Sequence, residues 1–313
     1  MPSLASITSN PTLQAFAQGA AQQATQPVAD FIAPTVSVAT SVGRYKVYTE
    51  KNRFRIPSTA RAVGGRAVQL GFDAADATYN CQPHALDFPI DNLEQLEAGD
   101  LENMFQEGST AVAEIAGLAH EKAVIDAALT AAGAGTGKTW NSSADPVDDI
   151  DTQILNVIKA ARYGSLMGVG VLFGATAWKI FKNNANVRAK FVTGGRPGNA
   201  SGAALAIPTE QMVGQLFVGT PEVRTSYMVY DAAAEGLSDS ISFLLDAVVL
   251  IFARKANPTR RDPSFMKTFR LMNQWMVPGS YTRDDGRVEV AKFDWSEDVK
   301  VTNSAAVVRL NIS

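Results

Sequence analysis

Residues 171–187 read VLFGATAWKIFKNNANV, and this stretch decides the fold. Its first letters belong to an apolar run over 169–173, which predicts a buried strand that ends at Gly174. Residues 176–191 have helical composition. A second helix is expected to begin at Asp145-Pro146, because Asp is a favoured N-cap and Pro suits the first helical position. A buried strand that leads directly into a helix indicates an α/β region.

Upstream, residues 91–132 predict a long helix, since the run is rich in Ala, Leu, Glu and Met and contains no Pro. Its apolar residues recur every three, four or seven positions at Leu101, Phe105, Val112, Ile115, Ala119 and Ala123. Gly99 marks a break, and a helix over 100–131 would be about 48 Å long. That length suits a strut that crosses a whole subunit.

Downstream, a Gly-rich stretch at 194–208 predicts a loop. Strands are expected at 215–218, 224–229, 241–245, 247–253, 265–269, 287–293 and 305–312.

The N-terminal residues 1–42 carry one charge, Asp30, and residues 13–29 are rich in Ala and Gln. Such a segment has too few large apolar groups to build a core of its own. Composition leaves two interpretations open: an arm that becomes ordered against something else, or a floppy tail.

The net charge of −3 hides a strong segregation of charge. Residues 43–72 predict a projecting β-hairpin, which contains seven basic residues and one acidic residue, Glu50. The basic residues are Arg44, Lys46, Lys51, Arg53, Arg55, Arg61 and Arg66. Residues 67–121 then contain eleven acidic residues and no Lys or Arg. The hairpin of one copy can therefore lie on the acidic strut of another, a heterologous contact that builds rings or arrays. Two solvated faces, or a hairpin that contacts nucleic acid, remain alternatives.

The scarcity of Cys and His excludes several classes of site. Cys81 is the single cysteine, so no intrachain disulfide or cysteine-rich zinc site can form. His84 and His120 are the two histidines, too few for a histidine-rich metal centre. We interpret Cys81 and His84 as structural and expect no catalytic residue, metal or cofactor. The longest apolar run, 247–253, is too short to cross a membrane, and the absence of basic residues before Arg44 predicts no signal peptide.

Residues 132–139, AGAGTGKT, fit a permissive phosphate-loop pattern through Gly137, Lys138 and Thr139. A phosphate loop needs a strand before it and a helix after it, whereas a long helix is expected before this one. A Gly-rich turn after a helix is the competing interpretation.

The order of these segments resembles the major capsid proteins of tailed bacteriophages, which have the Hong Kong 97-like shell fold. The stretches that carry the resemblance are 29–38 for the arm, 45–72 for the loop, 77–86 for the strand into the spine helix, and 145–150 and 171–187 for the axial domain. Their order matters more than any one motif, and the resemblance spans nearly the whole chain.

The resemblance implies an α+β Hong Kong 97-like capsid fold with an N-terminal arm at 1–43 and an extended loop, a β-hairpin, at 44–76. It further implies a peripheral domain with a long spine helix at 77–144, an axial α/β domain at 145–258, and a return to the peripheral domain at 259–313. The expected function is self-assembly through pentamers and hexamers into an icosahedral shell around double-stranded DNA, in a virion assembled in the host bacterial cytoplasm. Expected partners are further copies of the chain, a separate scaffolding protein and a portal, without a membrane. The candidate inter-subunit residues are Arg53, Arg55, Arg61, Arg66, Asp91, Glu94, Glu97, Asp100 and Glu102. A cellular encapsulin-type shell and a nucleotide-binding protein remain the alternatives.

Overall fold

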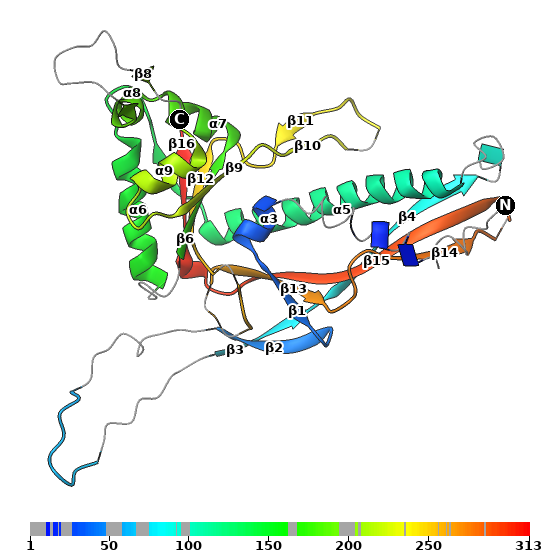
Figure 1. Ribbon diagram of the computed structural model, residues 1–313, viewed down its shortest axis with the longest axis horizontal. Helices are drawn as coiled ribbons and strands as arrows, with labels where there is room; N and C mark the ends of the chain where they lie inside the picture. Colours follow the sequence, from blue (N-terminus) through cyan, green and yellow to red (C-terminus); the bar gives the residue numbers. More distant parts are fainter. Residues whose placement is uncertain are drawn as a thin grey trace.

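A computed structural model describes most of the chain. The described residues are 11–12, 15–17, 19, 27–47, 58–66, 75–91, 93–94, 101–161, 168–193, 204–205, 208–234, 236–255, 257–260, 262, 264–284 and 286–313. Helix α5 (Leu101–Ala132) runs through the middle of the molecule, with one sheet alongside it and a second beyond its C-terminal end (Figure 1). Its 32 residues confirm the predicted strut. It begins later than residue 91 because the preceding strand continues through Asp91.

The first sheet lies along α5 and contains five strands. They are β1 (Thr35–Val38), β4 (Gln82–Asp91), β13 (Met266–Leu271), β14 (Val277–Thr282) and β15 (Val288–Val301). Their order is β1-β13-β15-β14, with β4 antiparallel to β15 from Asp91↔Val288 to Gln82↔Glu297. The long strand β15 therefore joins the whole sheet.

Helix α5 can lie close to this sheet because of a glycine in its second turn. A Cβ on Gly108 would lie 2.4 Å from the ring of Phe88 on β4, closer than atoms can approach. Phe105 and Val112 on either side of it are buried against Phe293 of β15 in one apolar cluster. The glycine that weakens the helix in isolation is thus required by the packing.

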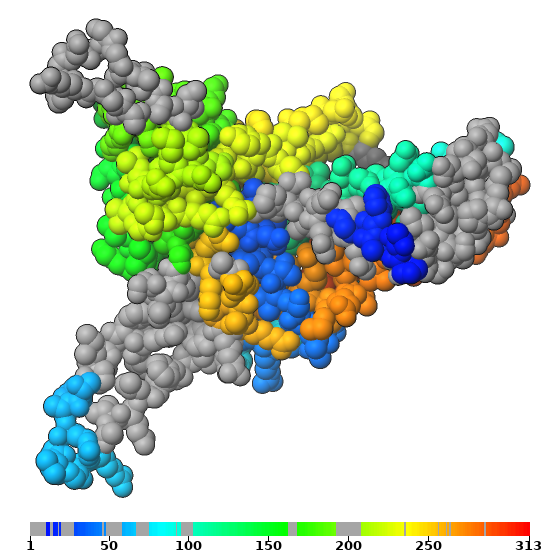
Figure 2. All heavy atoms as spheres, in the orientation of Figure 1, coloured from blue at the N-terminus to red at the C-terminus, as the bar shows by residue number. Residues whose placement is uncertain are grey.

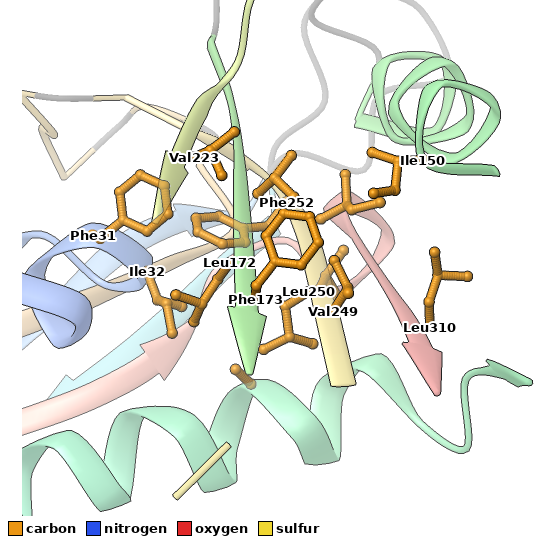
Figure 3. Close-up of a cluster of buried hydrophobic side chains, with 14 of the residues drawn as sticks. Phe31, Ile32, Ile150, Leu172, Phe173, Val223, Val249, Leu250, Phe252 and Leu310 are labelled. Atoms are coloured by element: carbon orange, nitrogen blue, oxygen red, sulfur yellow. The ribbon is translucent and has the colours of Figure 1, made fainter. Parts of the chain in front are cut away.

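The second sheet has the order β5-β16-β12-β6-β9. Its strands are β5 (Thr136–Lys138), β6 (Gly168–Gly174), β9 (Glu222–Ser226), β12 (Val248–Arg254) and β16 (Val307–Ile312). Residues 249–253 of β12 are buried throughout, as expected for a central strand with covered faces. Helices α6 (Pro146–Ala161) and α7 (Ala175–Asn183) pack on it. The strand–helix unit predicted at 171–187 therefore forms the core of this sheet, part of which appears in Figure 3.

Two predictions in this region are wrong in detail. The helix expected over 176–191 divides into α7 and α8 (Ala185–Lys190), because the Asn184 side chain accepts from the backbone N–H groups of Asn186 and Val187 and starts a new helix. The strand expected at 215–218 is replaced by α9 (Glu210–Leu216), whose first turn is capped by the Thr209 hydroxyl.

The C-terminal strand also lies elsewhere than expected. The segment 259–313 was predicted to return as a whole to the peripheral domain, and β13, β14 and β15 do join the first sheet. Strand β16 instead pairs antiparallel with β12 and parallel with β5 in the second sheet. Leu310 and Ile312 are buried there, and that burial fixes the strand's place.

The N-terminal arm is ordered against the rest of the chain over 27–38. Helix α3 (Pro27–Ile32) packs on α5, and β1 pairs parallel with β13. This contradicts a floppy tail for these residues. Strands β2 (Val42–Val47) and β3 (Ala75–Asn80) form the antiparallel base of the predicted hairpin.

Four short strands complete the described elements, with a 3-10 helix at Ser304–Ala306. They are β7 (Val192–Thr193), β8 (Ala204–Leu205), β10 (Val229–Asp231) and β11 (Ile241–Phe243). Within the described residues, no helix is both long and apolar enough to span a membrane.

Candidate assembly surfaces

The base of the projecting hairpin is fixed firmly to the first sheet. The Tyr79 ring on β3 stacks on Phe269 of β13 at 4.7 Å between centroids, and Tyr45 of β2 lies 5.2 Å from the same ring. The backbone N–H of Asn80 donates to the Asp298 carboxylate at 2.8 Å. Gly43 is required below Tyr79, since a Cβ there would lie 2.3 Å from the hydroxyl oxygen. A rigid base defines the direction in which the loop leaves the body.

Residues 58–66, drawn in light blue, lie away from the body of the molecule (Figures 1 and 2). Arg61 donates to the Gly65 carbonyl oxygen at 2.8 Å across a turn in which Gly64 has φ +82°. Arg61 and Arg66 are exposed. Of the other predicted basic residues, Arg53 and Arg55 lie outside the described residues.

The acidic candidates that the structure describes lie at the opposite extremity. Asp91 ends β4, where its carboxylate accepts from the backbone N–H of Leu93 at 2.8 Å, and Glu94 follows. Both are exposed. Glu97 and Asp100 lie outside the described residues, and the structure describes the backbone of Glu102 in α5 but not its side chain. The structure therefore does not bring Arg61 or Arg66 together with Asp91 or Glu94 within one chain (Figure 1).

A buried polar cluster beneath α5 was missed by the sequence analysis. The Glu297 carboxylate of β15 lies 3.0 Å from Nδ1 of His120 and 2.8 Å from Nη2 of Arg270. Burial opposes ionisation of Glu297, but His120 and then Arg270 outweigh it and lower the pKa of this carboxyl to about 2. The Arg270 guanidinium stacks over the Trp275 ring at 3.6 Å. The His120–Glu297 contact therefore links α5 to the first sheet, in addition to the apolar cluster of Phe105, Val112 and Phe293.

Glu121, next to His120 in α5, is a second missed residue. The sequence analysis counted it among the eleven acidic residues of 67–121, yet its side chain is completely buried. The available signal was its register: Val124, Ile125 and Ala128 follow at three, four and seven residues and are all buried.

The Gly-rich stretch 132–139 begins at the last residue of α5, turns, and contains the short strand β5. A helix precedes it, and Lys138 lies 2.6 Å from the Asp149 carboxylate in a local ion pair. The indole N–H of Trp140 donates to the other oxygen of that carboxylate at 3.0 Å. A phosphate loop follows a strand and leads into a helix, whereas this turn follows a helix and leads into a strand. Lys138 is engaged by Asp149.

Cys81 and His84 have structural surroundings. The Cys81 thiol is buried and lies 3.5 Å from the Phe269 carbonyl oxygen, while the His84 ring stacks on Trp295 at 5.5 Å. Among the described residues, no three His, Cys, Asp or Glu side chains gather closely enough to hold a metal ion.

In sequence, the chain matches no protein-family model and no curated protein. In structure, it is similar over 96% of its length to 96% of a phage-related protein from Bordetella bronchiseptica, with a TM-score of 0.66 and 16% identity. It is similar over 92% of its length to 88% of the SrpI encapsulin chain from Synechococcus elongatus, with a TM-score of 0.55 and 10% identity. It is also similar over 91% of its length to 86% of a chain in the mature capsid of bacteriophage PhiM1, with a TM-score of 0.53 and 11% identity. Over nearly its whole length, the chain has the Hong Kong 97-like fold of phage capsid proteins.

Proposed function

We propose that this chain is the major capsid protein of a tailed bacteriophage, many copies of which assemble through pentamers and hexamers into an icosahedral shell around double-stranded DNA. The observation that supports the proposal is the fold, which matches a phage-related protein and a mature phage capsid over nine-tenths or more of this chain. The work of such a protein is contact with its own copies, so no catalytic residue and no cofactor is assigned.

The proposal includes the partners that a phage shell requires. A separate scaffolding protein and a portal would take part in assembly inside the host bacterial cytoplasm, and the finished shell would form the virion. No membrane partner is proposed.

The contact between copies that we propose joins the basic loop to the acidic surface of a neighbour. Arg61 and Arg66 are exposed on the loop, and Asp91 and Glu94 are exposed at the other extremity of the chain. Because the two groups lie far apart in one copy, opposite charges could meet only between copies, and such a heterologous contact closes rings or extends arrays. The predicted residues Arg53, Arg55, Glu97, Asp100 and Glu102 belong to the same proposal.

An encapsulin-type cellular shell is the second candidate, favoured by the likeness to the SrpI encapsulin chain. Its particles would enclose protein cargo rather than a genome. The two candidates share one fold, so the contents of the particle and not its architecture separate them.

Electron cryo-microscopy of the expressed chain, with and without candidate scaffolding proteins from its own genome, tests both. The phage proposal expects closed icosahedral particles, and terminase and portal genes beside this gene. Closed particles from a gene beside a cargo enzyme would transfer the assignment to the encapsulin class. A chain that stays monomeric under every assembly condition would contradict both.

Charge reversal tests the loop contact separately. Replacing Arg53, Arg55 and Arg61 by Glu is expected to abolish closed particles while leaving the fold unchanged by circular dichroism. Adding Asp91→Lys and Glu94→Lys is expected to restore part of the assembly, because the charges are then exchanged. Unchanged assembly of the triple variant would refute the charge pairing.

The matched control is a triple reversal elsewhere on the surface, at the exposed residues Lys179, Lys255 and Arg283. It changes the net charge equally, so it should assemble normally if the position of the charge and not its amount decides assembly.

A further inference from the structure

Glu121 is an unusual residue for the interior of a protein. Its side chain in α5 is fully buried, and neither carboxylate oxygen has a hydrogen-bond partner among the described residues. An ionised carboxylate in such a place loses its hydration without compensation, which is why buried carboxylates are normally paired or hydrogen-bonded. Packing alone therefore does not explain why a carboxyl group is buried at this position.

Among the described residues, the elements packed on α5 place no cation against Glu121. From α3, the charged group that acts on it is another carboxylate, Asp30. From the β15 side, Glu297 is already held by His120 and Arg270.

The charged side chains described on β16 and β4, which also pack on α5, have other hydrogen-bond partners. From β16, the Arg309 guanidinium donates to Asn311 and to the Gly133 carbonyl oxygen. From β4, the Asp87 carboxylate accepts from the Tyr281 hydroxyl. A proton is therefore the simplest species that can neutralise Glu121.

Burial, and then the negative charge of Asp30, raise the pKa of the Glu121 carboxyl from 4.5 to about 7. The group is then neutral in weak acid and ionised in weak base. The contact between α3 and α5 is therefore favourable in weak acid, whereas in weak base it contains a buried, unpaired negative charge.

Of the surrounding elements, the arm segment is the easiest to detach. Helix α3 has six residues, and β1 has four and is the edge strand of its sheet. The same apolar cluster contains Val28 and Ile32 of α3 and Val124 and Ala128 of α5, a few residues from Glu121. Detaching residues 27–38 would uncover Phe31 and Ile32 and give Glu121 access to water, but it would leave the pairing of the other strands in both sheets intact.

We propose that Glu121, together with Asp30, is a proton-operated latch for the arm segment 27–38: protonation keeps α3 docked on α5, and ionisation favours its release. The contact lies within one chain, so the proposal does not depend on shell assembly.

The expected size of the effect follows from the two protonation equilibria. The docked state binds the proton more tightly than the released state, in which Glu121 has its ordinary pKa of 4.5. Docking is therefore strongest below pH 4.5, weakens as the pH rises from 4.5 to 7, and is constant above that. The ratio of docked to released arm should fall by up to about 300-fold across this window.

Hydrogen–deuterium exchange of peptides that cover 27–38, measured from about pH 5 to about pH 8.5 and corrected for the intrinsic exchange rate, tests the latch. The natural chain should lose protection there as the pH rises. Glu121→Gln should keep high protection at every pH, because its amide cannot ionise. Asp30→Asn removes the charge that helps to raise the pKa of docked Glu121. In this variant the loss of protection should be smaller and should end at a lower pH, since ionised Glu121 is then tolerated better.

Glu114→Gln is the matched control, because Glu114 is an exposed glutamate on the same helix. This variant should follow the natural chain at every pH. Protection of 27–38 that is independent of pH in the natural chain, or a Glu121→Gln variant that still loses protection, would overturn the proposal. If Glu121→Gln fails to fold, the response of Asp30→Asn decides: exchange identical to that of the natural chain refutes the latch.

Discussion

Replacing Asp262 by Asn should show how strongly burial controls the contribution of an ion pair to the free energy of unfolding of this protein. Lys267 of β13 is completely buried, and its Nζ lies 3.3 Å from the Asp262 carboxylate. The same carboxylate accepts from both the backbone N–H and the hydroxyl of Ser264, at 3.1 and 2.7 Å. The Lys267 ammonium also donates to the Thr259 carbonyl oxygen at 2.6 Å. Asn has nearly the same shape, so the substitution removes the charge and keeps most of the packing.

The magnitude follows from the distance and the burial. Two unit charges 3.3 Å apart attract by about 5 kcal/mol at an effective dielectric constant of about 20, and by about 1 kcal/mol in water. Removing one partner of a buried pair leaves the other charge uncompensated and typically costs about 3–5 kcal/mol. We expect Asp262→Asn to lower the free energy of unfolding by about 3 kcal/mol, since Lys267 keeps its carbonyl partners.

The chain provides a matched control in Lys292 and Asp294. Their Nζ–O distance is also 3.3 Å, but the two side chains are 44% and 46% exposed. Asp294→Asn should therefore cost less than about 1 kcal/mol.

Urea unfolding followed by tryptophan fluorescence would measure both variants, on unassembled chain so that contacts between copies do not contribute. If the two substitutions cost the same within about 0.5 kcal/mol, burial does not control the pair and the reasoning is refuted.

Three further predictions concern the core, the free energy of unfolding at low pH, and the arm. Gly174→Ala should lower the soluble yield and cost at least about 2 kcal/mol of stability, because its Cβ would lie 2.0 Å from the Asp246 carbonyl oxygen, whereas Gly137→Ala meets no atom within 4 Å and should be neutral. Glu297, whose pKa is lowered from 4.5 to about 2, stabilises the fold above pH 4.5 and loses this contribution as the pH falls towards 2. Glu297→Gln should therefore cost up to about 3 kcal/mol near pH 7 and flatten the acid limb of a plot of unfolding free energy against pH. Phe31→Ala should cost about 3 kcal/mol and raise hydrogen exchange in the arm first, because the ring packs edge-on against Phe252 at 5.3 Å between centroids; uniform loss of protection across the chain would contradict this.

Local pattern predicted much of the fold. The apolar run before Gly174 and the cap at Asp145-Pro146 depend on neighbouring residues alone, and both β6 and α6 form where they were expected. The long helix was predicted for the same reason, since a helix of 32 residues shows its period many times. Short segments were harder to predict. A strand was expected at 215–218, yet residues 215–216 are the last two residues of α9, whose first turn is capped by the Thr209 hydroxyl.

Part of the candidate assembly surface could also be predicted, because charge segregation is a property of the sequence. Arg61 and Asp91 are exposed, and their pairing between copies remains a proposal. What no local pattern could show is that the described basic and acidic candidates lie at opposite extremities of one chain (Figure 1).

The sequence by itself determined the order of the segments, the buried strand before Gly174, the long helix and the separation of basic from acidic residues, because each of these is written in near neighbours or in composition. Only the tertiary structure decided that β16 joins the second sheet, since that pairing joins residues 307–312 to a strand about sixty positions earlier. It alone decided that Glu121 is buried while Glu114, on the same helix, faces water. The physical reason is the same in both cases: burial depends on which distant segments cover a residue, and the chain has no local signal for that.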